Sequence, residues 1–496
     1  MRKLLSGIAA VGAAAVGVAA AVKSRAPGFD TATAPVSHTD RTGRNKRFVG
    51  MSGKAGAGYA AHKARRVFAG AERRDELDRR FEVKTAEQVV ETLGEMKGAL
   101  MKIGQMASFL DQGMPDHVRE VLAQLQQNAP PMSVELVEQA VVDELGSKPA
   151  DIFAEFDPEP IAAASIGQVH RAITHDGRAV AVKVQYPGVD EAIESDLANA
   201  DALFIGLQAL FPGLDPESIA AELRARILEE LDYEHEAANQ QHFADYYREH
   251  PFIHVPSVLP EHSTRRVLTT ELANGARFSE VVATWSQEER NLAAETLYRF
   301  AFGGIYRLQA FNGDPHPGNY LFRPGGEVVF LDFGLVKRFD DAALDGFERL
   351  ITAMVIDGDA SRFRGVIEEL GLLKPDQPFS DQLVNDYFGH FYDFVVKDGV
   401  NTITSDYAAA TVRHIFDTSG PFAEIRQNAN VPPDFVILQR INLGLFALFG
   451  ELNATANWRG VAEELWPWTD GPPATPMGEA LLQWRRAHED WEPTRG

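Results

Sequence analysis

The stretch "ADIFAEFDPEPIAAASIGQVHRAITHDGRAVAVKVQYPG", residues 150–188, decides the fold of this chain. Its apolar and polar residues alternate in short runs, which is typical of β-strands that bury one face. Asp176 and Gly177 separate two such runs, and an Asp-Gly pair is a strong signal for a tight hairpin turn. We therefore predict an antiparallel sheet over residues 152–187.

The segments on both sides of this sheet have helical patterns. "SVELVEQAVVDEL", residues 133–145, predicts a helix capped by Ser133, and residues 87–127 repeat apolar side chains every three or four positions. Helical patterns return over 190–250. "HVPSVLPEHSTRRVLTTEL", residues 254–272, adds two strands, and the remaining chain is mostly helical. A small sheet-rich part before a larger helical part predicts an α+β fold with two lobes and a cleft between them.

Two short segments of the helical part concentrate polar side chains. "GDPHPGN", residues 313–319, holds two prolines and two glycines, so it cannot be helical and presents Asp314 and Asn319 from a rigid loop. "FLDFG", residues 330–334, places Asp332 at the end of a short apolar strand. Mg²⁺ prefers oxygen ligands, which Asn319 and Asp332 would supply. Asp314 would then orient or deprotonate a hydroxyl group or a water molecule.

A lysine lies in the middle of the sheet segment. Lys183 belongs to "VAVKV", where its neighbours point to the opposite face and Ala181 shares its own face. A half-buried lysine needs an anionic partner, either a phosphate or a glutamate on a helix. A strand Lys, a helix Glu, a loop Asp and Asn, and a metal-binding Asp before Phe-Gly are together the parts of a kinase-like phosphoryl-transfer site.

On these residues the chain resembles the UbiB/AarF family of atypical kinase-like proteins, whose members support quinone and lipid metabolism. The resemblance is specific over residues 87–340 and looser to about 460. The matching segments occur in kinase order: "KIGQ" at 102–105, "AAASIGQV" at 162–169, "VAVK" ending at Lys183, "ELDYEHEA" at 230–237, "GDPHPGN" at 313–319 and "LDFG" at 331–334.

The resemblance implies a role for each matching position, with ATP and Mg²⁺ as cofactors. Lys183 would pair with Glu236 and touch the nucleotide phosphates. Asp314 would be the catalytic-loop aspartate, and Asn319 and Asp332 would bind Mg²⁺. An alanine-rich turn replaces the glycine-rich loop of kinases and narrows how the phosphates can lie. Its residues would cover the nucleotide, and backbone near the end of the last sheet strand would contact adenine: Ala162, Ala163, Ala164 and Ser165, and Glu271 to Ala273.

The same resemblance implies a regulatory contact. Lys102 and Gln105 would lie on a family-specific helix over the active site, where Lys102 would meet Glu230 and Asp232. This helix would occlude the place where a protein substrate docks, which favours ATP hydrolysis or action on a small lipid-like molecule. Taken alone, Lys102 could be a solvated helix lysine, and the two acidic residues could be surface charges.

The predicted architecture is a bilobal protein-kinase-like fold with added segments. Its parts are a membrane-associated helix at 1–25, a basic linker at 26–85, a helical extension at 86–150, an N-lobe at 151–272, a C-lobe at 273–462 and a tail at 463–496.

The first residues predict contact with a membrane. Residues 1–66 carry twelve Lys or Arg against two Asp, which is a net charge of +10. The whole chain has a net charge of −23, so the remaining residues carry −33. A basic arm favours an anionic surface, and the acidic body argues for lipid and against nucleic acid. Residues 4–22 are uncharged and could be a membrane-inserted helix, a signal peptide or a peripheral helix. The basic residues that follow would place the body on the cytoplasmic face. The absence of cysteine excludes disulfides and thiolate metal sites.

Three further features of the C-terminal half have ordinary structural interpretations. His316 is expected to stabilise its loop, because no second histidine lies at metal-ligand spacing. The apolar run at 435–452 is interrupted by polar residues, which favours a buried helix over a membrane span. The tryptophans between 458 and 491 are expected to form a packed tail, although they could also lie at a membrane interface.

The sequence thus predicts a membrane-associated atypical kinase or ATPase that uses Mg-ATP and supports isoprenoid quinone or lipid metabolism. The expected partners are an anionic or quinone-containing membrane and a lipid-like small molecule or quinone-pathway enzymes. Two alternatives are a protein Ser/Thr kinase and a nucleotide-gated scaffold for membrane enzymes that performs no chemistry.

Overall fold

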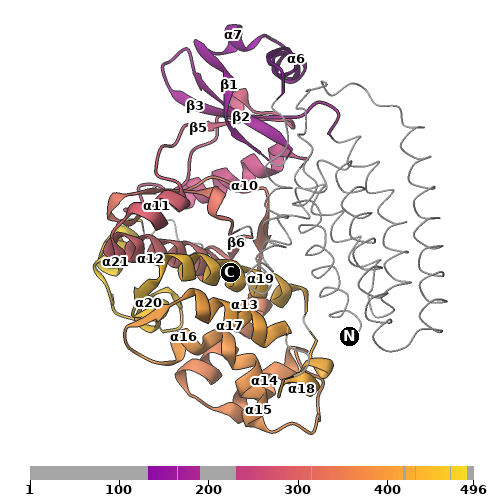
Figure 1. Ribbon diagram of the computed structural model, residues 1–496, viewed down its shortest axis with the longest axis vertical. Helices are drawn as coiled ribbons and strands as arrows, with labels where there is room; N and C mark the ends of the chain where they lie inside the picture. The colour runs from indigo at the N-terminus through magenta and orange to yellow at the C-terminus, as the bar shows by residue number, and fades with distance from the viewer. Residues whose placement is uncertain are drawn as a thin grey trace, which may run out of the picture. The chain divides into compact units, whose positions relative to one another are not determined.

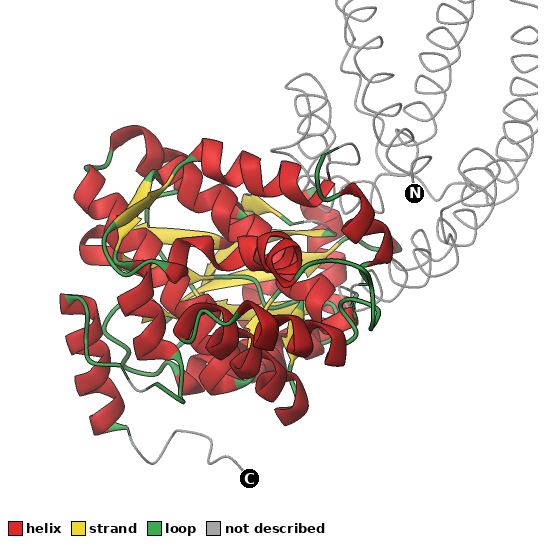
Figure 2. Ribbon diagram, turned by 90° about the horizontal axis from the view of Figure 1, so that it is seen from below, coloured by secondary structure: helices red, strands yellow, loops and turns green. Residues whose placement is uncertain are grey.

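A computed structural model describes residues 132–164, 166–189, 231–313, 315–416, 420–430, 432–469 and 471–488. The segments predicted as a membrane helix at 4–22 and as helix at 87–127 lie outside the described residues, as do residues 190–230. Helices make up most of the described region, and the strands lie among them (Figure 2).

A four-stranded sheet forms the first part of the described chain, at the top of Figure 1. All of its neighbouring strands are antiparallel, in the order β1-β2-β3-β5. The hairpin between β2 and β3 turns at Gly177, whose φ of 86° is a backbone conformation that favours glycine. The predicted sheet and its Asp-Gly turn are therefore confirmed. The strands are β1 (Glu155–Ala163), β2 (Gly167–Ile173), β3 (Ala179–Gln185) and β5 (Val267–Glu271).

One face of this sheet packs against two short helices, α6 (Val134–Leu145) and α7 (Pro149–Ile152). The Ser133 hydroxyl accepts a hydrogen bond from the Leu136 N–H and caps α6, as predicted. Alternate residues of β3 point into a buried apolar cluster that α6 completes, which leaves Lys183 on the opposite face. The residues of β3 and α6 in this cluster are Val180, Val182, Val184, Val137 and Val141.

Helix α10 (Tyr233–Tyr246) lies between the sheet and the helical region (Figure 1). Asp232 is its N-cap, and the carboxylate accepts hydrogen bonds from the N–H groups of Glu234 and His235. This cap fixes where the helix begins and therefore which of its side chains face β3.

The helical region surrounds a large core of buried side chains. Its helices are α11 (Phe278–Thr284), α12 (Gln287–Gly303), α13 (Asp341–Ile351), α14 (Ala360–Glu369), α15 (Asp381–Phe388), α16 (Asp393–Val396), α17 (Ser405–Phe416), α18 (Ala423–Asn428), α19 (Pro433–Leu452), α20 (Trp458–Leu465) and α21 (Pro476–Ala487). Two π-helical turns extend α12 and α13: η3 (Gly304–Leu308) and η6 (Thr352–Ile356). Short 3₁₀ turns are η2 (Pro260–His262), η4 (Pro317–Asn319), η5 (Pro324–Gly326) and η7 (Gly389–Tyr392).

Short strands also occur within the helical region. The pairs are β4 (Ile253–His254) with β8 (Glu327–Phe330), β8 with β7 (Tyr320–Arg323), β6 (Ala310–Asn312) with β9 (Val336–Arg338), and β10 (Asn401–Ile403) with β11 (Ala454–Ala456). The two strands predicted within 254–272 therefore belong to different sheets, since β4 pairs with β8 rather than with β5. The prediction that 313–319 cannot be helical was also too strict. The prolines exclude an α-helix, but Pro317–Asn319 form one 3₁₀ turn, which needs fewer backbone donors.

The two apolar features of the C-terminal half are part of the core. Helix α19 buries most of its second half, which confirms the interpretation of 435–452 as a core helix. Trp458, Trp466 and Trp484 are buried, as expected for a packed tail, and Trp491 lies outside the described residues. Among the residues that the structure describes, no helix is long and apolar enough to cross a membrane.

Candidate active site

Lys183 and Glu236 form the centre of the candidate site. The Lys183 Nζ donates to both carboxylate oxygens of Glu236 at 2.8 Å, joining the middle of β3 to the first turn of α10. The side chains are 18% and 4% exposed, so this pair is nearly enclosed. Burial alone would lower the pKa of Lys183, but the charge of Glu236 outweighs it and raises that pKa above its ordinary value. Burial raises the pKa of Glu236, and the Lys183 ammonium opposes that rise.

An aromatic ring covers the same ammonium group. The Lys183 Nζ lies 4.7 Å from the centroid of the Tyr233 ring, which is within the range of a cation–π interaction. Tyr233 is 1% exposed, and its backbone N–H donates to the carbonyl of Arg265 next to β5. Tyr233 and Glu236 lie three positions apart on α10, so one helix face supplies both contacts to Lys183.

The Asp-Phe-Gly segment lies beside this pair. A Cβ added to Gly334 would lie 3.5 Å from Asp332 Oδ1 and 3.8 Å from Glu236 Oε2, so the two carboxylates flank Gly334. The Gly334 N–H donates to Asp332 Oδ1 at 3.0 Å, which holds the Asp332 carboxylate next to Gly334. Asp332 is close enough to Lys183 to contribute to the raised pKa of the lysine.

Asn319 and Asp332 meet at one end of a β-hairpin. Tyr320 of β7 pairs with Phe330 of β8, and just beyond them the Leu331 N–H donates to the Asn319 carbonyl at 3.0 Å. Both side chains therefore emerge from the same end of the hairpin. An amide oxygen and a carboxylate are hard oxygen donors, and this donor set fits Mg²⁺. Asp314, the predicted catalytic residue between β6 and η4, lies outside the described residues.

The alanine-rich segment forms the turn between β1 and β2. Ala162 and Ala163 end β1, and the Ala164 N–H donates to the Gly167 carbonyl at 2.9 Å to close the turn. A Cβ on Gly167 would lie 2.2 Å from the carbonyl oxygen of Val184 in β3, so this position accepts only glycine. Ser165, at the tip of the turn, lies outside the described residues.

The segment predicted to contact adenine begins where β5 ends. The Glu271 N–H already donates to the Ser257 carbonyl, and its carboxylate accepts from His254 Nε2 at 3.1 Å. The Leu272 N–H donates to the Ala179 carbonyl. Within the predicted segment these bonds commit two backbone donors to the protein itself. The expected adenine-contacting N–H is therefore that of Ala273.

The predicted regulatory residues fall mostly outside the described chain. Lys102, Gln105 and Glu230 are not described. Asp232 is described, and its carboxylate caps α10 through the N–H groups of Glu234 and His235. Whatever else it contacts, Asp232 has a structural role that its position in an acidic stretch did not reveal.

Three residues that support the site were not singled out from the sequence. Asn239 donates to the Phe333 carbonyl at 3.3 Å, and the Asn312 side chain donates to the Asp332 carbonyl, so two buried amides hold the backbone of the Asp-Phe-Gly segment. The third is Tyr233. Helical spacing could have identified Tyr233 and Asn239, because they flank Glu236 three positions away on either side.

The predicted role of His316 is confirmed. Its Nδ1 accepts a hydrogen bond from the Gly318 N–H at 3.1 Å and holds the η4 turn. Among the described residues, no group of three or more His, Cys, Asp or Glu side chains is arranged to hold a metal ion.

The arrangement defines a class of protein. A lysine on the third strand of an antiparallel sheet pairs with a glutamate on the next described helix, beside an Asp-Phe-Gly segment and an Asn-bearing turn. This is the arrangement of the protein-kinase-like fold.

Comparison with known proteins agrees with this class. Residues 124–366 match the model of the ABC1 atypical kinase-like domain. The mitochondrial atypical kinase COQ8B of Rattus norvegicus is 33% identical over 67% of this chain and 63% of its own length. The probable serine/threonine-protein kinase abkA of Dictyostelium discoideum is 30% identical over 68% of this chain and 63% of its own. A solved structure of the Mycobacterium tuberculosis protein Rv3197 in complex with erythromycin aligns with a TM-score of 0.60 and 31% identity.

That solved structure covers 80% of this chain and 100% of its own chain. The chain belongs to the UbiB/AarF family of ABC1 atypical kinase-like proteins, as its motifs predicted. It spans 63% of the length of the COQ8B and abkA proteins named above.

Proposed function

We propose that this protein transfers phosphoryl groups from Mg-ATP, either to water or to a small lipid-like molecule at a membrane surface, in support of isoprenoid quinone or lipid metabolism. The observation that carries the proposal is the enclosed Lys183–Glu236 pair with the carboxylate of Asp332 beside it. A buried ion pair of this kind stabilises a fold only weakly, so its position beside a donor set for a metal ion favours a catalytic role.

Each described residue of the site would have a separate role in this reaction. Lys183 would orient the nucleotide phosphates, while Glu236 holds the ammonium in place and keeps it charged. Asn319 and Asp332 would hold Mg²⁺, which would neutralise charge on the phosphates. Asp314 would orient the attacking hydroxyl or water. The turn at Ala162 to Ala164 would cover the nucleotide.

Two further observations support the substrate class and the membrane. The relatives include mitochondrial atypical kinases named COQ8, and the UbiB/AarF family supports quinone and lipid metabolism. Residues 1–66 carry a net charge of +10, which favours an anionic lipid surface.

The test measures phosphate release from ATP by the full chain, with Mg²⁺ or with a chelator, and with or without vesicles that contain anionic lipid. Binding of a fluorescent ATP analogue is measured in parallel. We expect Mg²⁺-dependent hydrolysis that rises with the vesicles and is lost in Asp332→Asn. The matched control is Asp386→Asn, which changes an exposed carboxylate on α15 in the same way and should keep full activity.

The alternatives give different outcomes. Nucleotide binding without turnover above the Asp332→Asn level would reject catalysis and favour a scaffold. Transfer of labelled phosphate to added protein at a rate above hydrolysis would favour a protein kinase. Hydrolysis that does not respond to vesicles would reject the membrane part of the proposal and leave the chemistry intact.

A further inference from the structure

Residues 272–276, which we call the connecting segment, join β5 of the sheet to α11 of the helical region. The protein holds the backbone of this segment on both sides of Ala273. Before Ala273, two backbone N–H donors are already bonded to the protein, as described above. After it, Ala276 and Phe322 of β7 exchange two backbone hydrogen bonds of 2.8 Å and 2.9 Å. The segment is therefore attached to the sheet at one end and to β7 at the other.

The connecting segment lies directly against β7 at Gly275. A Cβ added to Gly275 would lie 2.9 Å from the Leu321 Cβ and 2.9 Å from the Phe322 carbonyl oxygen. Glycine is the residue that permits so close an approach of another backbone. Strand β7 begins directly after Asn319, the predicted metal ligand. One short strand, roughly 10 Å long, thus joins the metal-binding end of the site to the connecting segment.

A guanidinium group adds a third contact at the end of β7. The Arg323 Nε donates to the carbonyl of Asn274, the residue after Ala273, at 2.8 Å. The Arg323 Nη1 donates to the carboxylate of Glu327, which lies opposite it on β8. A guanidinium presents its donors in a fixed planar fork, so the bond to Glu327 directs the Nε–H at Asn274. The Arg323 and Glu327 side chains are 32% and 36% exposed, and an ion pair of this exposure adds little stability by itself.

The charge of Arg323 also reaches the residue before the connecting segment. The hydrogen bond from His254 lowers the pKa of the Glu271 carboxyl, and the charge of Arg323 lowers that pKa further, while burial opposes both effects. Arg323 therefore acts on the backbone that follows Ala273 and on the side chain at the end of β5.

We propose that Arg323 is a positioning residue, which fixes the connecting segment so that the Ala273 backbone binds the base of the nucleotide. This role rests on the proposed function, because it takes Mg-ATP as the ligand. A segment that is already ordered binds a flat base without first losing conformational entropy. Loss of the Arg323 bond would free Asn274, and binding of the base would then have to order the segment. The phosphates and Mg²⁺ would contact other residues, so their binding should not depend on Arg323.

The test compares two ligands of the full chain by isothermal titration calorimetry in the presence of Mg²⁺. The ligands are ATP and inorganic tripolyphosphate, which has a triphosphate chain and no base. Wild-type protein should bind ATP more tightly. Arg323→Met should weaken ATP binding by about tenfold, as expected for loss of a hydrogen bond from a charged group, and should leave tripolyphosphate binding unchanged. Arg323→Lys keeps the charge without the planar fork and should restore part of the affinity for ATP.

A second variant tests the same contact from the other side. Gly275→Ala should push the connecting segment away from β7, so it should also weaken ATP binding and leave tripolyphosphate binding unchanged. In turnover assays, Arg323→Met and Gly275→Ala should raise the KM for ATP more than they lower kcat. Tripolyphosphate binding reports that each variant is folded.

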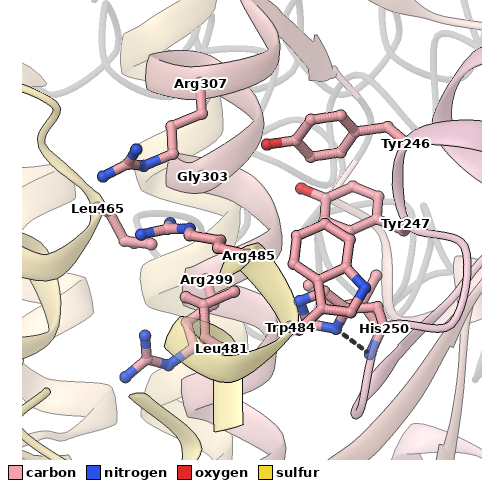
Figure 3. Close-up of a pocket in the computed structure, with 11 residues that line it drawn as sticks. Tyr246, Tyr247, His250, Arg299, Gly303, Arg307, Leu465, Leu481, Trp484 and Arg485 are labelled. Carbon is pink, nitrogen blue, oxygen red and sulfur yellow. Dashed lines mark hydrogen bonds between the residues drawn. The ribbon is translucent and has the colours of Figure 1, made fainter. Parts of the chain in front are cut away.

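Two controls separate positioning from general damage. Arg277→Met changes an exposed arginine just after the connecting segment and should bind both ligands as wild type does. Leu481→Ala enlarges the small cavity that Figure 3 shows, which is lined by residues of α10, α12, α20 and α21. This variant should lower stability without changing the ratio of the two affinities.

The remaining outcomes distinguish this role from the proposed function. Equal weakening of ATP and tripolyphosphate by Arg323→Met would overturn the positioning role, because Arg323 would then support β7 and its metal-binding end as a whole. Equal affinity of the wild-type protein for the two ligands would overturn it as well, and the phosphate site would stand. If the wild-type protein binds neither ligand, the proposed function itself is rejected and the role of Arg323 with it.

Discussion

In the described part of the chain, a nearly enclosed ion cluster of the sheet region and one of the helical region are built differently. Arg299 of α12 donates to Glu295 and Glu464, and also to the Thr475 hydroxyl, so one planar guanidinium ties α12 to α20 and to the cap of α21. Its side chain is 1% exposed. Lys183 donates to the carboxylate of Glu236 and lies over the ring of Tyr233, and its side chain is 18% exposed.

The difference separates a structural cluster, that of Arg299, from the Lys183–Glu236 cluster, which we propose to be functional and call the functional cluster. The guanidinium of Arg299 is held by several hydrogen bonds from elements far apart in the chain, and the Ala474 N–H adds another bond to Glu464. Such a network fixes the helices relative to one another. The Lys183 ammonium points both of its hydrogen bonds at Glu236 and retains some exposure, so it can also meet a phosphate. The same kind of interaction therefore serves packing in one region, and under the proposed function it would serve chemistry in the other.

The largest effect that we expect comes from breaking the structural cluster. Arg299→Met should lower the free energy of unfolding by about 3–5 kcal/mol, because it leaves two buried carboxylates without their cation. Urea denaturation followed by circular dichroism measures this loss. Arg349→Met, which breaks a more exposed ion pair with Glu369, is the control and should change stability little. Equal losses for the two variants would show that burial of the Arg299 cluster adds no stability.

Breaking the functional cluster should mainly reduce ATP turnover, whereas breaking the structural cluster should mainly reduce stability. Lys183→Met should reduce ATP turnover by about 10²–10³-fold, as removal of one preorganised electrostatic contact does in other enzymes. Its stability loss should depend on pH. Without the ammonium, burial keeps the pKa of Glu236 raised. Below about pH 4.3 the carboxyl is neutral in both the folded and the unfolded chain and does not change stability. The loss of stability grows as pH rises through the raised pKa.

Two measurements check this profile: turnover at saturating ATP, and urea unfolding of the variant at several pH values. Lys397→Met, a change at an exposed lysine after α16, is the control for both. A Lys183→Met protein with normal turnover would mean that the pair is structural, like that of Arg299, and would remove the main support for the proposed function.

The sequence predicted the elements of the functional cluster better than those of the structural one. Alternation in β3 placed Lys183 on the face opposite Val182, and the family motifs paired it with Glu236, which the distances of 2.8 Å match. Nothing local marks Arg299, whose partner Glu464 is 165 positions away. Contacts between residues so far apart in the sequence depend on how the helices pack. No periodic pattern or motif in a single sequence predicts that packing.

The same reason explains the errors and gaps in the fold. The position of β4 beside β8 depends on a pairing between residues more than seventy positions apart, so local alternation could show a strand but not its sheet. The 3₁₀ turn at Pro317–Asn319 needs only three residues, fewer than any periodic pattern can reveal. The amide contacts of Asn239 and Asn312 to the Asp-Phe-Gly backbone likewise follow from tertiary packing.

A smaller effect would sharpen the description of the functional cluster. Tyr233→Leu removes the ring over Lys183 and should reduce turnover by about 2–30-fold, the range of a cation–π contact of about 0.5–2 kcal/mol. Tyr233→Phe keeps the ring face and should stay close to wild type. The comparison uses kcat and KM for ATP, and a role in positioning should appear mainly in kcat. If Tyr233→Phe loses as much as Tyr233→Leu, the hydroxyl is responsible and the ring contact is not.

The smallest effect concerns a neutral polar group in the sheet region. His170 is fully buried between the Gln168 side chain, at 2.8 Å from its Nε2, and the Asp157 carbonyl, at 2.8 Å from its Nδ1. Burial lowers the pKa of His170, so the folded protein holds the neutral ring and protonation would break the bond to Gln168. The stability from this arrangement is present above the unfolded pKa of about 6.5 and is lost as pH falls through the lowered value.

We therefore expect the free energy of unfolding to fall between pH 7.5 and 5, and His170→Gln to make this fall shallower, measured by urea denaturation across the range. His175→Gln, at the exposed hairpin turn, is the control. The Gln168 side chain that contacts His170 also accepts a hydrogen bond from the Met132 N–H at 2.9 Å, so Gln168 connects the segment before α6 to β2. An unchanged slope in His170→Gln would place the pH response in the histidines of the helical region, where burial also lowers the pKa of His250 and His414.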